Sequence, residues 1–448
     1  MSLHLTDEPL NKDSAENDVI KLLTEKVNQL YLYRDNYFEK NSSEEDACNK
    51  NKNVEEELRK TLSNFEQFKD AGQQKNRAYF FYLKGKALNV KSNHDSKAEE
   101  ALSKAVKFDP KLVDAWNELG ECYWKKDDII GAKNCFINAL AHQKNKVSLR
   151  NLSMVLRQIP TKTLAERISN IEESLLKAKE AVQLDPNDGI SWTILGNAHL
   201  SSFFTISYNP KTLKLSLSSY IQAEKDACAR TKPDLYYNKA MALKYEEEYQ
   251  QALESFSKAI SLDPIWDTAR HKEEELCNYL SNVQELISCK GKLKGKKLQN
   301  LIQAIDEKHL GPYHCGTFLS TGNQKVKIDH VPLSELNPGV NPGKVILGKV
   351  VCSVLSEDEI PFTFCLVDKM ESCIAVTLYN LGKGQGVLIG DSVAIPEPFL
   401  TRVHVKHKGK EYCFDSIRVE RPVFMVVNGK NVSRDKEATV QHTYFKKD

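Results

Sequence analysis

Three stretches of this chain repeat one another: DAWNELGECYW at residues 114–124, GISWTILGNAHL at 189–200 and DLYYNKAMAL at 234–243. Asp-Pro pairs follow apolar, helix-like runs at 109–110, 185–186 and 263–264. Small and large apolar residues alternate in these units on a frame of roughly 34 residues. Small residues let two antiparallel helices approach closely, and the large ones fill the gap to the next pair. The repetition therefore predicts a stack of helical hairpins.

The spacing inside the units matches the tetratricopeptide repeat (TPR) pattern. The slots for aromatic, small and apolar residues and for the closing proline are filled in the last unit by Tyr236, Ala240, Leu243, Ala252, Phe256, Ala259 and Pro264. An earlier unit matches with Trp116, Leu119, Gly120, Tyr123, Ala132, Phe136 and Ala139. We expect a TPR solenoid with Gly120 buried between two helices and with Trp116, Phe136, Trp192 and Phe256 in its core. Solenoids of this kind usually hold a ligand in their concave groove.

Composition limits the class of protein. The chain has 448 residues, enough for two or three domains. Its formal net charge is only +2, which argues against a protein that binds nucleic acid non-specifically through its overall charge. Its 11 cysteines are scattered and contain no C-x-x-C pair, which favours reduced thiols over disulfides or a zinc site. No apolar run approaches the length of a membrane span or a signal peptide. We expect a protein of the cytoplasm and nucleus, without metal or cofactor and without membrane contact.

The hydrophobic pattern of the sequence changes at residue 311, where helical periodicity ends and alternating runs rich in Val, Ile and Phe begin. Turn signals such as Asn-Pro-Gly at 337–339 and 341–343 separate these runs. Five or more strands in such a short region favour a barrel of the OB type after a mainly helical part. The expected organisation is a disordered N-terminus (1–14), a helical cap (15–77), a TPR solenoid with capping helices and a basic linker at 290–297 (78–310), an OB-fold-like domain (311–428) and a loose tail (429–448).

The whole chain resembles one family, that of tetratricopeptide repeat protein five, a stress-responsive cofactor. The resemblance rests on GKALNV at 85–90, HQKNKVSLRNLSMVLRQ at 142–158, ILGNAHLS at 194–201, QAEK at 222–225 and VLIGDSVAIPEP at 387–398. It implies an adaptor that reads the Met-Arg-Glu start of nascent tubulin at the exit of the large ribosomal subunit. Adaptors of messenger-RNA decay then remove the tubulin message. It also implies a nuclear coactivator that assembles acetyltransferase complexes in DNA damage and heat stress.

Candidate groove residues follow from the repeat frame, in which positions 2, 5, 9 and 12 of each first helix face the concave side. A groove with fixed cations, fixed anions and Asn amides suits an extended peptide bearing one positive and one negative side chain. The alternative is that these side chains pair with one another within the repeats. The expected peptide-binding residues are Asn117, Arg150, Arg157, Asn197, Asp234, Tyr237 and Asn238, with Asp114, Glu121, Met154, Thr193 and Lys244 also on this side.

Five lysines lie within eight residues, with two glycines and no acid between them. Such a strip can follow a phosphate backbone through counterion release, and ribosomal RNA beside a nascent chain would be a target. The alternative is a solvated linker between domains. These expected ribosome-binding or nucleic-acid-binding residues are Lys290, Lys292, Lys294, Lys296 and Lys297.

The strand-rich region offers a second possible contact with nucleic acid. OB barrels stack single-stranded bases on exposed aromatic residues beside basic groups, so single-stranded DNA or chromatin is a possible partner here. Docking of protein, or support of the fold, is the competing interpretation. The residues concerned are Phe362, Phe364, Tyr379, Phe399 and Tyr412, with Arg402, Lys406 and Lys408 beside them.

Catalytic motifs are missing from the sequence. LGKGQG at 381–386 lacks the P-loop pattern and lies between strands, so it predicts a hairpin turn. No nucleophile elbow or zinc-protease motif occurs, and a non-enzymatic adaptor is favoured. The alternatives are a transcription cofactor that acts through the barrel and a co-chaperone. The second is disfavoured because a carboxylate clamp needs a cationic groove, whereas this one carries Asp114, Glu121 and Asp234.

Overall fold

A computed structural model describes residues 12–40, 44–319, 325–355, 361–382 and 385–436. The predicted disordered N-terminus and loose tail therefore lie mostly outside the described residues. The chain divides into two compact units. Unit 1 comprises residues 1–242 and 258–266, and unit 2 comprises residues 243–257 and 267–448. The expected domain boundary at residue 311 lies within unit 2.

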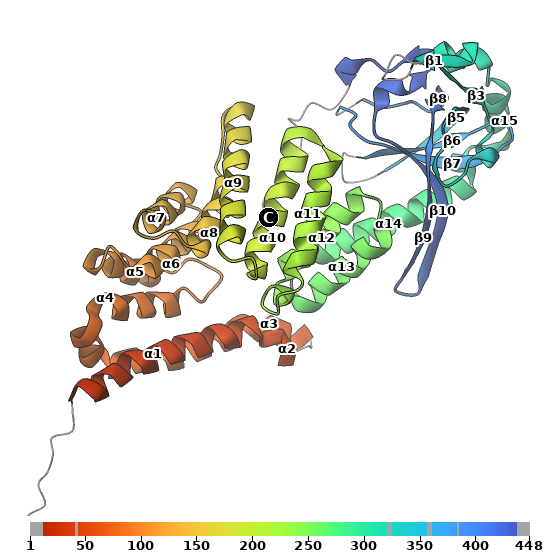
Figure 1. Ribbon diagram of the computed structural model, residues 1–448. Coiled ribbons are helices and arrows are strands. Elements are labelled where there is room, and N and C mark those ends of the chain that lie inside the picture. The colour runs from red at the N-terminus through yellow and green to blue at the C-terminus, as the bar shows by residue number, and fades with distance from the viewer. Residues whose placement is uncertain (1–11, 41–43, 320–324, 356–360, 383–384, 437–448) are drawn as a thin grey trace, which may run out of the picture. The chain divides into compact units, whose positions relative to one another are not determined.

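Unit 1 is a series of antiparallel helix pairs, as the repeats predict (Figure 1). The pairs are α4 with α5, α6 with α7, α8 with α9 and α10 with α11. The second helix of each pair begins at a side-chain N-cap. The helices of unit 1 are α1 (Lys12–Asp35), α2 (Tyr37–Lys40), α3 (Glu44–Gln67), α4 (Lys69–Leu88), α5 (Ser96–Phe108), α6 (Val113–Lys125), α7 (Ile129–His142), α8 (Lys146–Leu156), α9 (Leu164–Leu184), α10 (Gly189–Ser202) and α11 (Pro210–Ala223). Two further helices, α12 (Pro233–Tyr245) and α13 (Tyr249–Leu262), each have residues in both units.

A short irregular segment joins the two helices of the fourth pair. A π-helical segment, η1 (Phe203–Ser207), extends α10, and α11 begins at Pro210 with Asn209 as its N-cap. Pro at the first helical position is favourable because its missing N–H has no helical partner there. The extra residues therefore lengthen one turn of the solenoid and leave the helix pair intact.

Small residues mark where helices touch. A methyl group built on Gly120 of α6 would lie 2.6 Å from the ring of Phe136 in α7, closer than real atoms approach. Gly120 and Phe136 are both buried, as the repeat frame predicts. Phe256 is fully buried within its helix, again as predicted.

The two tryptophans correct the predicted core. Trp116 and Trp192 are half-buried and pack against the edge of their hydrophobic clusters. Each indole N–H donates to a carbonyl oxygen 2.8 Å away, of Pro110 and Pro186 respectively. An indole N–H needs such a partner, so the ring stays at the rim, where the Asp-Pro turn supplies one.

Replacing Gly120 with Leu should destabilise unit 1 by about 1–3 kcal/mol, because the side chain must displace the Phe136 ring. Denaturant unfolding followed by circular dichroism measures the loss. Gly295→Ala is the matched control, since a methyl group there would meet nothing within 4 Å. Equal stability of Gly120→Leu and the parent protein would contradict this packing.

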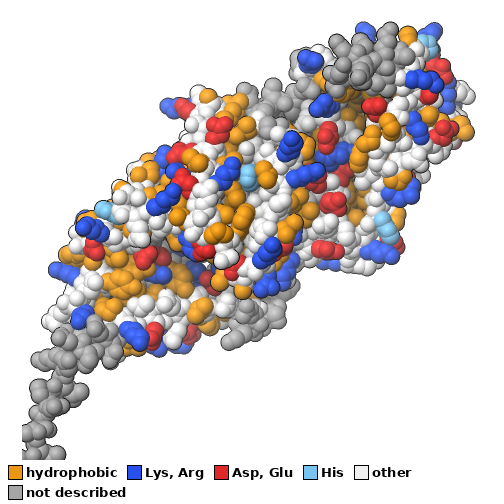
Figure 2. All heavy atoms as spheres, in the orientation of Figure 1, with side chains coloured by type: hydrophobic (Ala, Val, Ile, Leu, Met, Phe, Trp, Pro, Cys, Tyr) orange, Lys and Arg blue, Asp and Glu red, His pale blue; other side chains and the backbone are white. Residues whose placement is uncertain are grey.

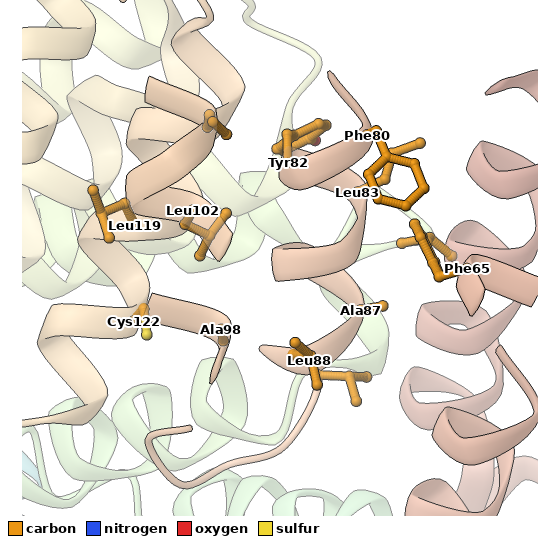
Figure 3. Close-up of a cluster of buried hydrophobic side chains, with 14 of the residues drawn as sticks. Phe65, Phe80, Tyr82, Leu83, Ala87, Leu88, Ala98, Leu102, Leu119 and Cys122 are labelled. Carbon is orange, nitrogen blue, oxygen red and sulfur yellow. The ribbon is translucent and has the colours of Figure 1, made fainter. Parts of the chain in front are cut away.

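The N-terminal helices do more than cap the first repeat. Phe65 of α3 packs against Phe80 of α4, with ring centroids 5.5 Å apart (Figure 3). The Tyr31 hydroxyl of α1 donates to the Lys86 carbonyl at 2.9 Å. At its end, α1 places Asp35 3.3 Å from Lys232, just before α12. The α1 helix therefore links the first helix pair to the start of the last one.

Unit 2 contains a mixed sheet with helices packed on it. Helix α14 (Asp267–Ser288), the turn η3 (Lys290–Lys292), helix α15 (Gly295–Gln303) and the 3₁₀ segment η4 (Glu307–Cys315) precede the strands. The main strands are β3 (Asp329–His330), β4 (Gly339–Val340), β5 (Lys344–Val354), β6 (Phe362–Val367), β7 (Cys373–Leu378), β8 (Ser392–Pro396), β9 (Phe399–His407), β10 (Lys410–Val419), β11 (Val426–Val427) and β12 (Lys430–Asn431), while β1 (Thr317–Leu319) and β2 (Lys325–Lys327) form a separate pair.

The expected barrel is not closed by hydrogen bonds. Among the described residues, pairing runs β12-β11-β8-β5-β6-β7-β10-β9-β4, with β3 beside β5. All the pairs on this path are antiparallel except β7 with β10, which is parallel. Strands β8 and β9 follow each other directly, but Glu397, with φ of +44°, bends the chain between them. The bend sends β8 to β5 and β9 to β10, and it leaves one long edge of β9 without a full partner.

Candidate peptide-binding site

Three side chains of unit 1 lie within hydrogen-bond or electrostatic reach of a fourth, Tyr220, and we call the set the Tyr220 cluster: Arg157, Asn197, Tyr220 and Asp234. Arg157 is the C-cap of α8, Asn197 lies in α10, Tyr220 in α11 and Asp234 in the first turn of α12. The Tyr220 hydroxyl donates to Asn197 Oδ1 at 2.8 Å. Burial raises the pKa of Tyr220, Arg157 lowers it and Asp234 raises it. A cation and an anion therefore both lie within electrostatic reach of one phenol.

Arg157 is a desolvated cation. Its Nη1 donates to Ser153 O at 3.1 Å, Ser153 Oγ at 3.0 Å and Ser174 Oγ at 2.9 Å. Burial lowers the pKa of its guanidinium to about 10. Within the part of the chain that the structure describes, no carboxylate forms an ion pair with it. Arg157 is half-buried, and a partly desolvated charge without a counterion favours an incoming carboxylate.

Asp234 is the matching anion. Its side chain is exposed, but the surrounding protein raises the pKa of its carboxyl by desolvation, which Lys232 partly offsets. The Lys232 ammonium itself pairs with Asp35. Over the described ranges no ion pair involves Asp234. Its position in the first turn of α12 suits a carboxylate, because the helix dipole is positive there.

The remaining predicted groove residues are placed differently. Asn117 is buried, and its Oδ1 accepts from Ser148 Oγ at 2.6 Å, which ties α6 to α8. Arg150 pairs with Asp188 at 3.2 Å, which ties α8 to α10. Both therefore make contacts between repeats, whereas the alternative interpretation expected pairs within the repeats, and any contact of theirs with a peptide stays a prediction.

Tyr237 and Asn238 lie one turn beyond Asp234 in α12. Both side chains are half-buried, and the Tyr237 ring lies 4.8 Å from that of Trp266, centroid to centroid. They follow Asp234 on the same helix, so a peptide that reaches this carboxylate passes near them. Their role in binding stays a prediction.

Sequence reasoning missed two features of this face. Tyr220 was not expected, although a methyl group on Gly196 would lie 2.5 Å from its ring, and a glycine at this slot signals a large partner. The second feature is the path of α1, which no pattern in the sequence predicted. Its Tyr31 lies within electrostatic reach of Glu118 and Glu121. Helix α1 therefore runs close enough to α6 for the two to interact electrostatically.

The lysine run is not a free linker. Lys290 pairs with Glu371 at 3.2 Å and Lys292 with Glu285 at 2.8 Å. Gly291, with φ of +74°, brings this turn against β5, where an added methyl group would lie 2.7 Å from Val351 O. Three of the five ammonium groups stay exposed and have no ion pair in the described structure: Lys294, Lys296 and Lys297.

The candidate stacking residues of unit 2 are mostly buried. Phe364, Tyr379 and Tyr412 are buried and Phe362 is half-buried, which leaves Phe399 as the exposed ring among the five. The predicted basic neighbours are paired: Arg402 with Asp415, Lys406 with Glu411 and Lys408 with Glu273. This arrangement gives no support to a stacking platform for single-stranded DNA. The turn at 381–386 falls partly outside the described residues.

One group of possible metal ligands occurs among the described residues. It consists of His404, Glu411 and Cys413, all exposed, with His404 Nε2 and Glu411 Oε1 2.7 Å apart. Lys406 also pairs with Glu411, which makes this a surface salt-bridge cluster. No described helix is both long and apolar enough to span a membrane.

Comparison with known proteins gives matches along the whole chain. The family model "Tetratricopeptide repeat protein 5 OB fold domain" matches residues 327–441, and the model "Tetratricopeptide repeat" matches residues 233–264. Tetratricopeptide repeat protein 5 of Homo sapiens is 50% identical over 94% of this chain and 95% of its own length. The protein of the same name from Mus musculus is 49% identical over 96% and 98%.

Comparison with solved structures gives partial matches. YrrB, described as a TPR protein with an unusual peptide-binding site, is 22% identical over 46% of this chain and 97% of its own, with a TM-score of 0.31. The complex of the anaphase-promoting complex subunits Cut9 and Hcn1 covers 60% of this chain and 50% of that one, at 13% identity and a TM-score of 0.40.

Proposed function

Since the chain belongs to the tetratricopeptide repeat protein 5 family, we propose that it is a non-enzymatic adaptor whose Tyr220 cluster binds the Met-Arg-Glu start of nascent tubulin. Binding at the ribosome would trigger decay of the tubulin message through decay adaptors in the cytoplasm. In the nucleus the same protein would act as a scaffold for acetyltransferase complexes during DNA damage and stress.

One observation carries the proposal: Arg157 and Asp234 carry opposite charges, lack ion pairs among the described residues and flank Tyr220. The glutamate of the ligand would meet the Arg157 guanidinium, whose planar fork matches a carboxylate. The arginine of the ligand would meet Asp234. The peptide backbone also needs hydrogen-bond partners, and the half-buried amide of Asn197 would supply one.

Three probes separate the candidate functions: a peptide beginning Met-Arg-Glu, a peptide with an acidic C-terminus and a single-stranded oligonucleotide. We expect only the first to bind in fluorescence anisotropy. The free α-amino group of that peptide is kept, and its scrambled sequence is the control. Tighter binding of the acidic C-terminal peptide would favour a co-chaperone, and binding of the oligonucleotide alone would favour the transcription cofactor.

The exposed lysines should serve the ribosome and leave peptide affinity unchanged. We expect Lys294→Glu combined with Lys296→Glu to weaken ribosome co-sedimentation, because both ammonium groups are exposed and free to release counterions. Binding of the Met-Arg-Glu peptide should stay at the parent level. Lys430→Glu, another exposed lysine of unit 2, is the charge-matched control. Equal losses in both assays would assign the strip to the peptide site or to the fold.

A further inference from the structure

Strand β9 presents an open backbone edge. It pairs with β10 along its whole length, but β4 covers only Phe399 and Leu400 on the other side. Backbone groups alternate between the two sides of a strand, and two hydrogen bonds reveal which residues face outward. Asn341 N donates to Pro398 O at 3.1 Å, and Lys406 N donates to Gln250 Oε1 at 2.9 Å. The even-numbered residues therefore face the edge, and Arg402 and His404 present their backbone N–H and C=O groups between these two contacts.

Both ends of this open segment are defined. At one end the open segment is limited by β4. The chain turns just before β4, where Asn341 Oδ1 accepts from Asn337 N. Pro338 in this turn has no N–H with which to extend the ladder. At the other end the Gln250 side chain takes the place of a partner strand. The uncovered stretch is thus residues 401–405, the length of one short strand.

A groove runs beside this edge. Its volume is about 890 Å³, and its walls are β9 and the turn between α12 and α13, which has the sequence Glu246-Glu247-Glu248. Glu247 is buried, with 2% of its side chain exposed, and its backbone has φ of +63°. One of its carboxylate oxygens accepts from the Tyr379 hydroxyl at 3.0 Å, and the other has no hydrogen-bond partner among the described residues.

We propose that this groove binds an extended segment of a partner protein, which adds a strand to β9 and directs a Lys or Arg side chain toward Glu247. The backbone of the segment would exchange hydrogen bonds with Arg402 and His404, in the manner of strand addition at a sheet edge. The acidic turn, with three consecutive glutamates, favours a basic side chain by charge. This surface belongs to unit 2 and is independent of the peptide site in unit 1.

Charge argues against nucleic acid as the occupant. The Arg402 guanidinium pairs with Asp415, and the Arg418 guanidinium pairs with Glu247 and Glu420. Three consecutive glutamates form the opposite wall. Basic and acidic side chains also intermingle on the molecular face drawn in Figure 2, without a broad basic patch. A phosphate backbone would meet carboxylates here, whereas a basic peptide would meet complementary charge.

The test measures the binding of two designed peptides to the full-length protein. The peptides are acetyl-Thr-Val-Thr-Lys-Thr-Val-Thr-amide and the same peptide with Glu in place of Lys. We expect the Lys peptide to bind about tenfold more tightly, a difference of about 1.4 kcal/mol. Hydrogen exchange followed by mass spectrometry should then show slower exchange in the segment that contains Arg402 and His404. In Glu247→Gln the two peptides should bind alike.

A backbone variant tests strand addition separately from charge. Arg402→Pro removes the outward N–H, while Arg402→Ala removes the same side chain and keeps that donor. We expect Arg402→Ala to bind the Lys peptide like the parent protein and Arg402→Pro to lose binding at least tenfold.

Four results would overturn the proposal. They are equal binding by Arg402→Pro and Arg402→Ala, an unchanged Lys preference in Glu247→Gln, protection of this segment by single-stranded DNA alone, and protection that rises with protein concentration in the absence of peptide. The last would assign the edge to a second copy of this chain.

Discussion

Reversing the charge of Arg157 should abolish binding of the Met-Arg-Glu peptide. In Arg157→Asp the glutamate of the ligand would face a carboxylate within a partly desolvated groove. Loss of a charge-assisted contact there costs roughly 1.5–3 kcal/mol, about ten- to a hundredfold in affinity. A Met-Arg-Lys peptide should regain part of the binding, because its lysine complements the new Asp. Isothermal titration calorimetry with both peptides measures the effect.

Two further variants protect this test against a folding defect. Arg157→Met keeps much of the side-chain volume without the charge, and Asp234→Asn changes an exposed side chain in the first turn of α12. Asp234→Asn should lose a similar factor in affinity while the thermal midpoint stays close to that of the parent protein. If Arg157→Asp binds both peptides as the parent does, or if Asp234→Asn is silent, the Tyr220 cluster is not the peptide site.

Breaking the buried ion pair of unit 2 should be the most destabilising single change. The Arg418 guanidinium lies 3.5 Å from Glu247 and 4.1 Å from the ring centre of Tyr379, and its Nη1 donates to Tyr245 O at 2.9 Å. Arg418→Met leaves the Glu247 carboxylate buried without its counterion. Removing one partner of such a pair costs about 3–5 kcal/mol. Denaturant unfolding of the full-length chain measures this loss.

The deficit of Arg418→Met should depend on pH in a defined direction. Burial raises the pKa of Glu247 even in the parent protein, and the loss of Arg418 removes the largest of the effects that lower it. Between the ordinary carboxyl pKa and the raised one, the folded state binds more protons than the unfolded state. The free energy of unfolding therefore falls as pH rises through this window, and the deficit shrinks as pH is lowered.

Matched variants complete this test. Arg402→Met breaks the exposed pair with Asp415 and should change the free energy of unfolding by no more than about 0.5 kcal/mol. Arg418→Met combined with Glu247→Gln should recover part of the loss, since no buried charge is left without a partner. Equal effects of Arg418→Met and Arg402→Met would show that the buried pair contributes no more than a surface pair does.

Local pattern was enough to predict the solenoid. Helix α9 spans Leu164–Leu184. Thr163 begins it with a capping box to Glu166, a signal contained within four residues. The contact between Gly120 and Phe136 was likewise predictable from the sequence, because both residues belong to one helix hairpin and the TPR frame sets their distance along the chain.

The candidate site was predictable only in part. The repeat frame placed Arg157, Asn197 and Asp234 on one face; in the structure Asn197 accepts a hydrogen bond from Tyr220, and Arg157 and Asp234 lie within electrostatic reach of it, while their role in peptide binding stays a prediction. The same frame also selected Asn117, and its burial depends on Ser148 of the next repeat. A position rule assigns a face to each residue, but it does not say which polar groups of neighbouring repeats satisfy one another.

The sequence by itself determined the TPR repeats, the change to strands near residue 311 and the charges available to a peptide, because periodicity and charge are local properties of the chain. Tertiary structure alone decided that α1 reaches Lys232, that the lysine run turns against β5 and that β9 keeps an open edge. Each of these depends on contacts between residues far apart in sequence. Their pairing is selected by packing and by the satisfaction of buried hydrogen bonds, and no window of neighbouring residues encodes it.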